Sequence, residues 1–242
     1  SGDLTMVYTT KTDQEATMGF ELSLNDILVE RLISLFPDID TLVPMLRSFE
    51  GMVDCQMTAT CKADSTMSVL LPSVNASCYL SGKNMVLLDG ETFTEISKTL
   101  MFKNKKRNMI DSIAVDLAIH DNKIEVFPFL VEMDRYKVAV GGTHNLDMTF
   151  DYHLSVLKSP VPFKLGIDIK GNLDDFKFMI VKCKYKDFLK PAKQAELDST
   201  RRNVREEIRE TIRKQIREAA PELGNSLSEI HPHTHGHVEE ST

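Results

Sequence analysis

The chain has 242 residues, a formal net charge of −7 and a sequence pI of about 5.5. This acidic balance argues against nucleic acid as a partner, because phosphate binding requires a basic patch. No apolar run approaches the roughly 20 residues needed to span a membrane. The length is enough for one large β-rich domain or two smaller ones. Ser1-Gly2 is typical of a cloning remnant, so we expect the sequence to be a fragment of a longer protein.

The first predicted elements are a β-hairpin and two helices. Residues 4–9 and 16–23 alternate in polarity and form the hairpin. Ser23 or Asn25 then caps a helix that runs to about residue 36. A second short helix is expected over residues 42–49.

Strands with one apolar face follow. Residues 53–63 alternate completely between apolar and polar side chains, and residues 74–80 continue that pattern. The remaining predictions here are a turn at 81–84, a short buried strand at 85–88, an amphipathic helix at 92–102 and a solvated basic loop at 103–107.

Four consecutive strands are predicted at the centre of the chain. Apolar side chains fall on odd positions in residues 113–119 and on even positions in residues 146–156, which is typical of strands with one apolar face. The two strands between them are expected at 124–133 and 136–140, with turns at 121–123, 134–135 and 141–142.

Two further strands, a charged helix and a tail are predicted for the C-terminal part of the chain. After a break at 159–162, two strands are predicted at 164–170 and 174–185, joined at 171–172. A charged amphipathic helix is expected over residues 191–220, with a narrow apolar stripe that is too thin for a buried core helix. The stripe consists of Val204, Ile208, Ile212 and Ile216. Residues 221–242 are predicted to be a disordered tail that contains histidine.

These elements predict a mainly β fold. About ten or eleven antiparallel strands and a few short helices occupy residues 1–190, and a helical tail follows. Strands with one apolar face close into a barrel, pair into a sandwich or bend around a groove. A large curved antiparallel sheet that forms a groove or half-barrel is the architecture we expect.

Several segments resemble the C-terminal region of the AsmA family, in the version found in Bacteroidetes. They are residues 121–129 (DNKIEVFPF), 138–142 (VAVGG), 145–154 (NLDMTFDYHL) and 171–176 (GNLDDF). The likeness covers about residues 16–190 and consists of turn and strand signatures.

The resemblance implies an envelope protein of Gram-negative bacteria with a periplasmic body and an inner-membrane anchor upstream of this fragment. The family is tied to outer-membrane biogenesis and is related to chorein-like bridge proteins, whose curved sheets carry lipid. The implied partners are therefore phospholipid acyl chains and the membrane.

The residues that could take part in catalysis or metal binding indicate neither an enzyme nor a cofactor. We find no nucleophile or phosphate-loop motif, and His120, His144 and His153 are expected to be solvated. The histidines at 231, 233, 235 and 237 are interpreted as a soluble tail and not as a metal site. Cys55, Cys61, Cys78 and Cys183 favour buried thiols, although a disulfide such as Cys61 to Cys78 stays open.

Two functional hypotheses remain. In the first, the apolar strand face lines a groove that binds or conducts phospholipid. Its lining would be Ile113, Val115, Leu117, Ile119, Leu146, Met148, Phe150 and Tyr152. In the second, the β-domain has a closed core and serves as a structural or interaction module of the envelope, with residues 196–220 as a helix that binds a partner protein.

Overall fold

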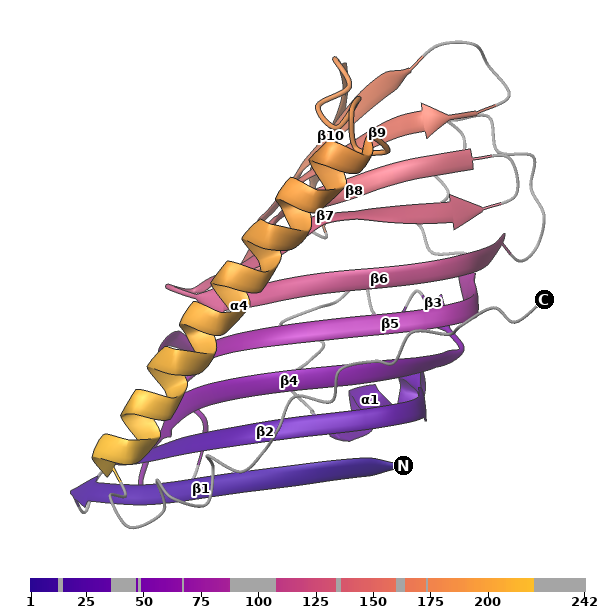
Figure 1. The fold of residues 1–242 in the computed structure, drawn as a ribbon. Helices are drawn as coiled ribbons and strands as arrows, with labels where there is room; N and C mark the ends of the chain where they lie inside the picture. The colour runs from indigo at the N-terminus through magenta and orange to yellow at the C-terminus, as the bar shows by residue number, and fades with distance from the viewer. Residues whose placement is uncertain are drawn as a thin grey trace, which may run out of the picture.

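The computed structural model describes residues 1–12, 15–35, 47, 49–66, 68–87, 108–133, 136–159, 164–172 and 174–219. These residues form one antiparallel sheet that does not close on itself, together with a long C-terminal helix (Figure 1). The expected fold class is thereby confirmed.

The strands follow one another through the sheet almost entirely in chain order. Their bounds are β1 (Gly2–Thr12), β2 (Glu15–Leu28), β3 (Phe49–Glu50), β4 (Met52–Ala63), β5 (Asn75–Leu87), β6 (Asn108–His120), β7 (Lys123–Met133), β8 (Tyr136–Asn145), β9 (Phe150–Lys158), β10 (Leu165–Gly171) and β11 (Phe176–Val181). Only β3 lies off this path, where it pairs with β5. Tight turns explain the order where they join consecutive strands: Asp121 and Asn122, for example, have φ values of 49° and 60° and join β6 directly to β7.

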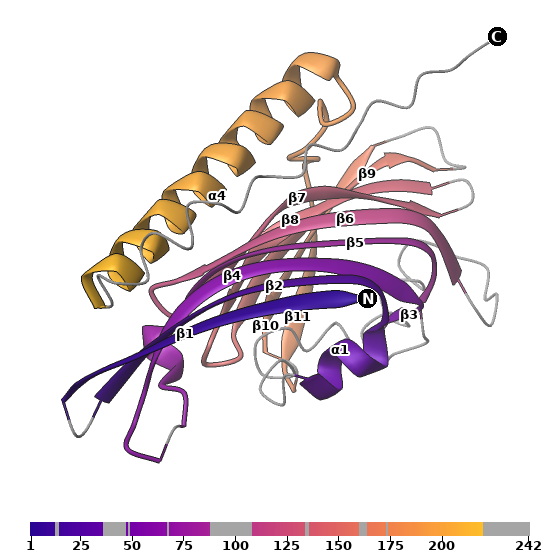
Figure 2. The same cartoon turned by 60° about the horizontal axis from the view of Figure 1, so that its bottom comes forward.

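Helices α1 (Val29–Leu35) and α4 (Pro191–Ala219) lie on opposite sides of the sheet. Figure 2 shows the strands arching over α1, with α4 outside the arch. We call the side toward α1 the inner face and the side toward α4 the outer face. A 3-10 turn, η2 (Leu71–Ser73), connects β4 to β5.

The helix expected after a cap at Ser23 or Asn25 was placed too early. β2 runs on to Leu28, and α1 begins only at Val29. A bulge in β2 explains the difference: Asp26 has a φ of 53°, and its N–H donates to Asp54 Oδ1 of β4 at 3.0 Å. A side chain of the neighbouring strand therefore supplies the hydrogen-bond acceptor that a helix cap was expected to supply to this backbone.

Two predicted turns are parts of strands. β5 passes through residues 81–84, where Asn84 (φ 53°) changes the phase of the alternation so that Met85 also faces the inner side. β8 passes through Gly141 and Gly142. A Cβ on Gly141 would lie 2.8 Å from the Tyr185 hydroxyl, so this position needs glycine for close packing and not for a turn.

Two predicted strands are too long. Residues 146–149 form a turn in which Asp147 Oδ1 accepts from the Thr149 N–H at 2.9 Å and from its hydroxyl at 2.6 Å. These local bonds replace the strand ladder. The other strand, β11, ends at Val181 instead of continuing to residue 185.

Other predictions fall partly or wholly outside the described residues. These are the helices at 42–49 and 92–102, the turn at 134–135, the basic loop at 103–107 and the tail at 221–242.

Candidate functional site: the inner face of the sheet

The inner face is continuous because directly paired residues of neighbouring strands point to the same side. Leu117 of β6 pairs with Val126 of β7. Further along, Tyr152 of β9 pairs with Ile169 of β10, which pairs with Phe178 of β11. The register thus extends one apolar surface across the sheet.

The structure brings seven of the eight predicted lining residues to this face. Ile113, Val115 and Leu117 belong to one cluster, Ile119 and Leu146 to a second, and Phe150 and Tyr152 to a third. Met148 is the exception, because it lies in the turn before β9 with a φ of 70°. The strand prediction was wrong at that residue, so alternation does not assign its side chain to the inner face.

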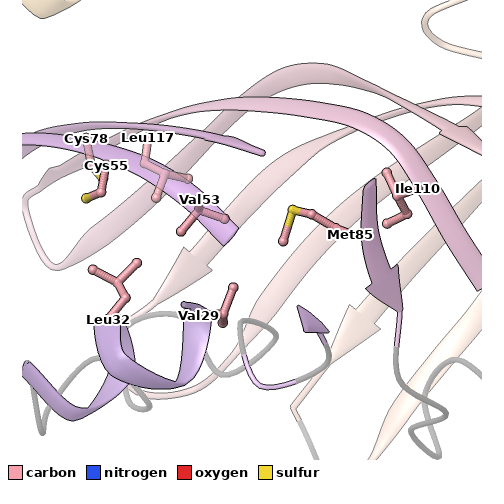
Figure 3. Close-up of a cluster of buried hydrophobic side chains, with 8 residues drawn as sticks. All are labelled: Val29, Leu32, Val53, Cys55, Cys78, Met85, Ile110 and Leu117. Atoms are coloured by element: carbon pink, nitrogen blue, oxygen red, sulfur yellow. The ribbon is translucent and has the colours of Figure 1, made fainter. Parts of the chain in front are cut away.

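The inner face has two different halves. In the half formed largely by β2, β4, β5 and β6, Val29 and Leu32 of α1 pack in one cluster with Val53, Cys55 and Leu117 (Figure 3). Each of these five residues is at most 6% exposed. This half is a closed core.

Among the described residues, the second half contains side chains of β8 to β11 and none of a helix, and we call it the open half. Its buried centre is Val138, Leu154, Val156, Ile167 and Ile169, and partly buried apolar side chains surround that centre. Those surrounding residues are Val140, Phe150, Tyr152, Leu165, Phe176 and Phe178. Burial among apolar neighbours raises the pKa of Tyr152 to about 12, as expected for a phenol in an environment that disfavours its charged form.

The apolar face continues to both free edges of the sheet. Ile180 pairs with Ile167 and is 73% exposed on β11, while Leu4 pairs with Leu22 and is 59% exposed on β1. Neither residue belongs to the lining predicted from the sequence. The alternation of Phe176, Phe178 and Ile180 was the signal that could have identified the β11 edge.

Charged contacts hold the C-terminal helix against the outer face. Asp116 of β6, with a side chain 11% exposed, accepts from Arg205, and its other oxygen lies 3.8 Å from Arg201 Nε. Arg201 also donates to the Pro128 carbonyl, and the Arg205 guanidinium lies 5.4 Å from the ring centroid of Tyr79. Helix α4 is therefore docked on its own sheet, with Ile212 only 1% exposed.

A cleft of about 800 Å³ lies between the first turns of α4 and the outer face. Phe129, Phe188 and Leu197 supply apolar lining, whereas Asp54 and Asp198 supply carboxylates. Asp54 accepts from the Asp26 N–H, and Asp198 pairs with Arg201 at 3.2 Å. This mixed surface is less suited to an acyl chain than the apolar inner face.

His153, Asp168 and Ser155 are connected in the order of a catalytic triad. His153 Nδ1 lies 2.6 Å from Asp168 Oδ1, and His153 Nε2 lies 2.9 Å from Ser155 Oγ. Ser155 has no exposed surface, however, and its Oγ accepts from the Tyr185 N–H at 2.9 Å. A substrate cannot reach a nucleophile in that position, so the geometry does not support hydrolysis here.

The network instead fastens the segment that links β11 to α4. The Lys184 N–H donates to His153 Nε2 at 3.1 Å, which takes this backbone out of the strand ladder. His153 is 7% exposed and His144 is 2% exposed, so the prediction that these two histidines are solvated was wrong. Alternation placed His153 on the polar face correctly, but it could not show that other parts of the chain cover that face. His144 pairs with Ile124 and Phe150 and therefore lies on the inner face.

All four cysteines lie in the described residues and are free thiols. Cys61 pairs with Met18, whereas Cys78 pairs with Met57, so the register does not bring Cys61 opposite Cys78. Within the described part of the chain, no three His, Cys, Asp or Glu side chains are grouped as metal ligands. The histidines at 231, 233, 235 and 237 are outside that part.

No helix among the described residues is both long enough and apolar enough to cross a membrane. No family model, curated protein or solved structure with which the chain was compared matches it.

Proposed function

We propose that this chain is the periplasmic part of an inner-membrane-anchored envelope protein of AsmA type, in which the open half of the inner face binds or conducts phospholipid acyl chains. The observation that carries the proposal is the apolar surface of β8 to β11, which continues to Ile180 at an unpaired sheet edge. An acyl chain placed there would gain about 25 cal/mol per Å² of apolar area removed from water.

We narrow the proposed lining on the basis of side-chain exposure. Leu117 and Ile119 are each 6% exposed, so they support the sheet rather than contact a ligand. Phe150 and Tyr152 remain partly buried beside Phe176 and Phe178, which makes them candidates for contact with lipid.

The docking-module alternative has less support. Its partner-binding helix would need a free apolar stripe, yet Ile212 is 1% exposed in the docked helix, and Leu197 packs with Phe188 against the outer face. What α4 offers a partner is its exposed side, which is formed by residues such as Arg202, Glu206 and Glu210.

Adjacent positions on β11 provide the test. Ile180 faces the inner side, whereas Met179, 45% exposed, faces the outer side. The chain and its Ile180→Asp and Met179→Asp variants would be incubated with vesicles of phosphatidylethanolamine and phosphatidylglycerol. Native mass spectrometry would then measure the retained phospholipid. We expect Ile180→Asp to lower retention several-fold and Met179→Asp to leave it unchanged, because only the first places a charge on the apolar path.

Circular dichroism and urea unfolding would establish that both variants keep the fold. Equal retention by the two variants, or an unliganded mass for the unmodified chain, would contradict the groove proposal. In the second case the docking-module hypothesis would gain weight, and removal of the residues after Lys190 would be expected to abolish association with its partner.

A further inference from the structure

Two thiols from neighbouring strands meet in the closed half of the inner face. Cys55 of β4 pairs with Leu80, and Cys78 of β5 pairs with Met57, so the two cysteines occupy diagonal positions across one strand pair. Diagonal positions lie farther apart than directly opposite ones, but the thiols of Cys55 and Cys78 are hydrogen-bonded to each other. Figure 3 shows Cys55 and Cys78 side by side in the same cluster as Leu117.

The two thiols are chemically unequal. A hydrogen bond from Cys78 lowers the pKa of the Cys55 thiol, although burial opposes this effect. The same hydrogen bond, together with burial, raises the pKa of Cys78 well above its usual value. Cys61, which lies elsewhere on the inner face, has its pKa raised by burial. In the folded sheet, Cys55 is therefore the member of the pair that more readily forms a thiolate.

We propose that Cys55 and Cys78 form a disulfide site that accepts oxidising equivalents from a disulfide oxidant. One of the two protein thiolates attacks one sulfur of the oxidant, which breaks its S–S bond and releases the first thiol. The other protein thiolate then attacks the protein sulfur of the mixed disulfide and releases the second thiol. Two protein thiols are oxidised by two electrons, and the oxidant is reduced to two thiols that carry the two protons.

The timing of the reaction follows from burial. Cys55 is 2% exposed and Cys78 is 7% exposed, so a protein oxidant cannot reach them directly in the folded sheet. We expect oxidation while β4 and β5 are still pairing, when both sulfurs are accessible. Once formed, the bond links two central strands and restricts the unfolded chain, which raises the melting temperature. This inference does not depend on lipid binding.

The test is refolding from urea in a mixture of oxidised and reduced glutathione. The double variant Cys61→Ser/Cys183→Ser retains only the proposed pair. We expect its mass to be lower by two hydrogen atoms, a peptide map to join Cys55 to Cys78, and its melting temperature to be several degrees above that of the same protein after reduction. The unmodified chain should give the same cross-link.

Cys78→Ser in that background is the control and should give free Cys55 or its glutathione adduct. Four alkylatable thiols in the unmodified chain after oxidative refolding, or a cross-link that includes Cys61 or Cys183, would overturn the proposal. A cross-link that lowers the melting temperature would also contradict it, because the strand pair would then be strained by the bond.

Discussion

The two faces of this sheet are covered in physically different ways, and β6 shows the contrast at adjacent residues. Leu117 points inward and packs with Cys55, Cys78 and α1, whereas Asp116 points outward and holds Arg205 of α4. The inner face depends on apolar area removed from water, which requires no particular partner. The outer face depends on a few polar groups, each of which needs a specific partner. Large-to-small changes should therefore weaken the inner face, and removal of single partners should weaken the outer face.

The largest effect is expected for Leu117→Ala on the inner face. The cluster around Leu117 is closed, so the deletion leaves a cavity and should lower the free energy of unfolding by about 2–5 kcal/mol. Urea unfolding would measure the change. Ser112→Ala, an exposed position on the same strand, should change stability by less than about 0.5 kcal/mol. Equal effects at the two positions would show that the inner face is not closed at Leu117.

A slightly smaller effect is expected for Asp116→Ala on the outer face. The substitution leaves Arg201 and Arg205 without their shared carboxylate in a largely covered site, at a cost of about 2–3 kcal/mol. Hydrogen exchange should become faster throughout α4. Asp198→Ala removes a carboxylate that is 58% exposed and also pairs with Arg201, so it should cost less than about 1 kcal/mol. Unchanged protection of α4 in Asp116→Ala would mean that apolar contacts such as Ile212 hold the helix.

The smallest of the three effects is expected for Ser155→Ala. It removes the acceptor of the Tyr185 N–H and one neighbour of His153, which should cost about 1–2 kcal/mol. Faster hydrogen exchange should be confined to the segment between β11 and α4. Loss of protection across the whole sheet would instead make Ser155 part of the global core.

Alternation was a reliable guide wherever a strand has one apolar and one polar face. It located the four central strands and placed seven of eight predicted residues on one surface. It misplaced features that depend on a single local contact. Gly141 was read as part of a turn because glycine is common there, but the Tyr185 side chain, far along the sequence, is what requires it.

The division of the candidate site into a closed and an open half likewise could not be predicted from local sequence patterns. Sequence alone could not separate the closed half of the inner face from the open half, because both have the same period-2 pattern. Which half is covered depends on α1, and α1 itself was predicted to begin several residues too early. The exposed edge at Ile180 likewise follows from the end of β11, which tertiary contacts of Lys184 and Tyr185 determine.

By itself, the sequence determined that this chain forms a mainly antiparallel sheet with one apolar side and ends in a charged helix. Period-2 and helical periodicities are local properties, and short turns leave consecutive strands few other partners. Only the tertiary structure decided that the sheet stays open, that α4 docks on the polar side through Asp116, and that His153 is buried. These outcomes depend on contacts between residues far apart in the chain, whose formation no local pattern encodes.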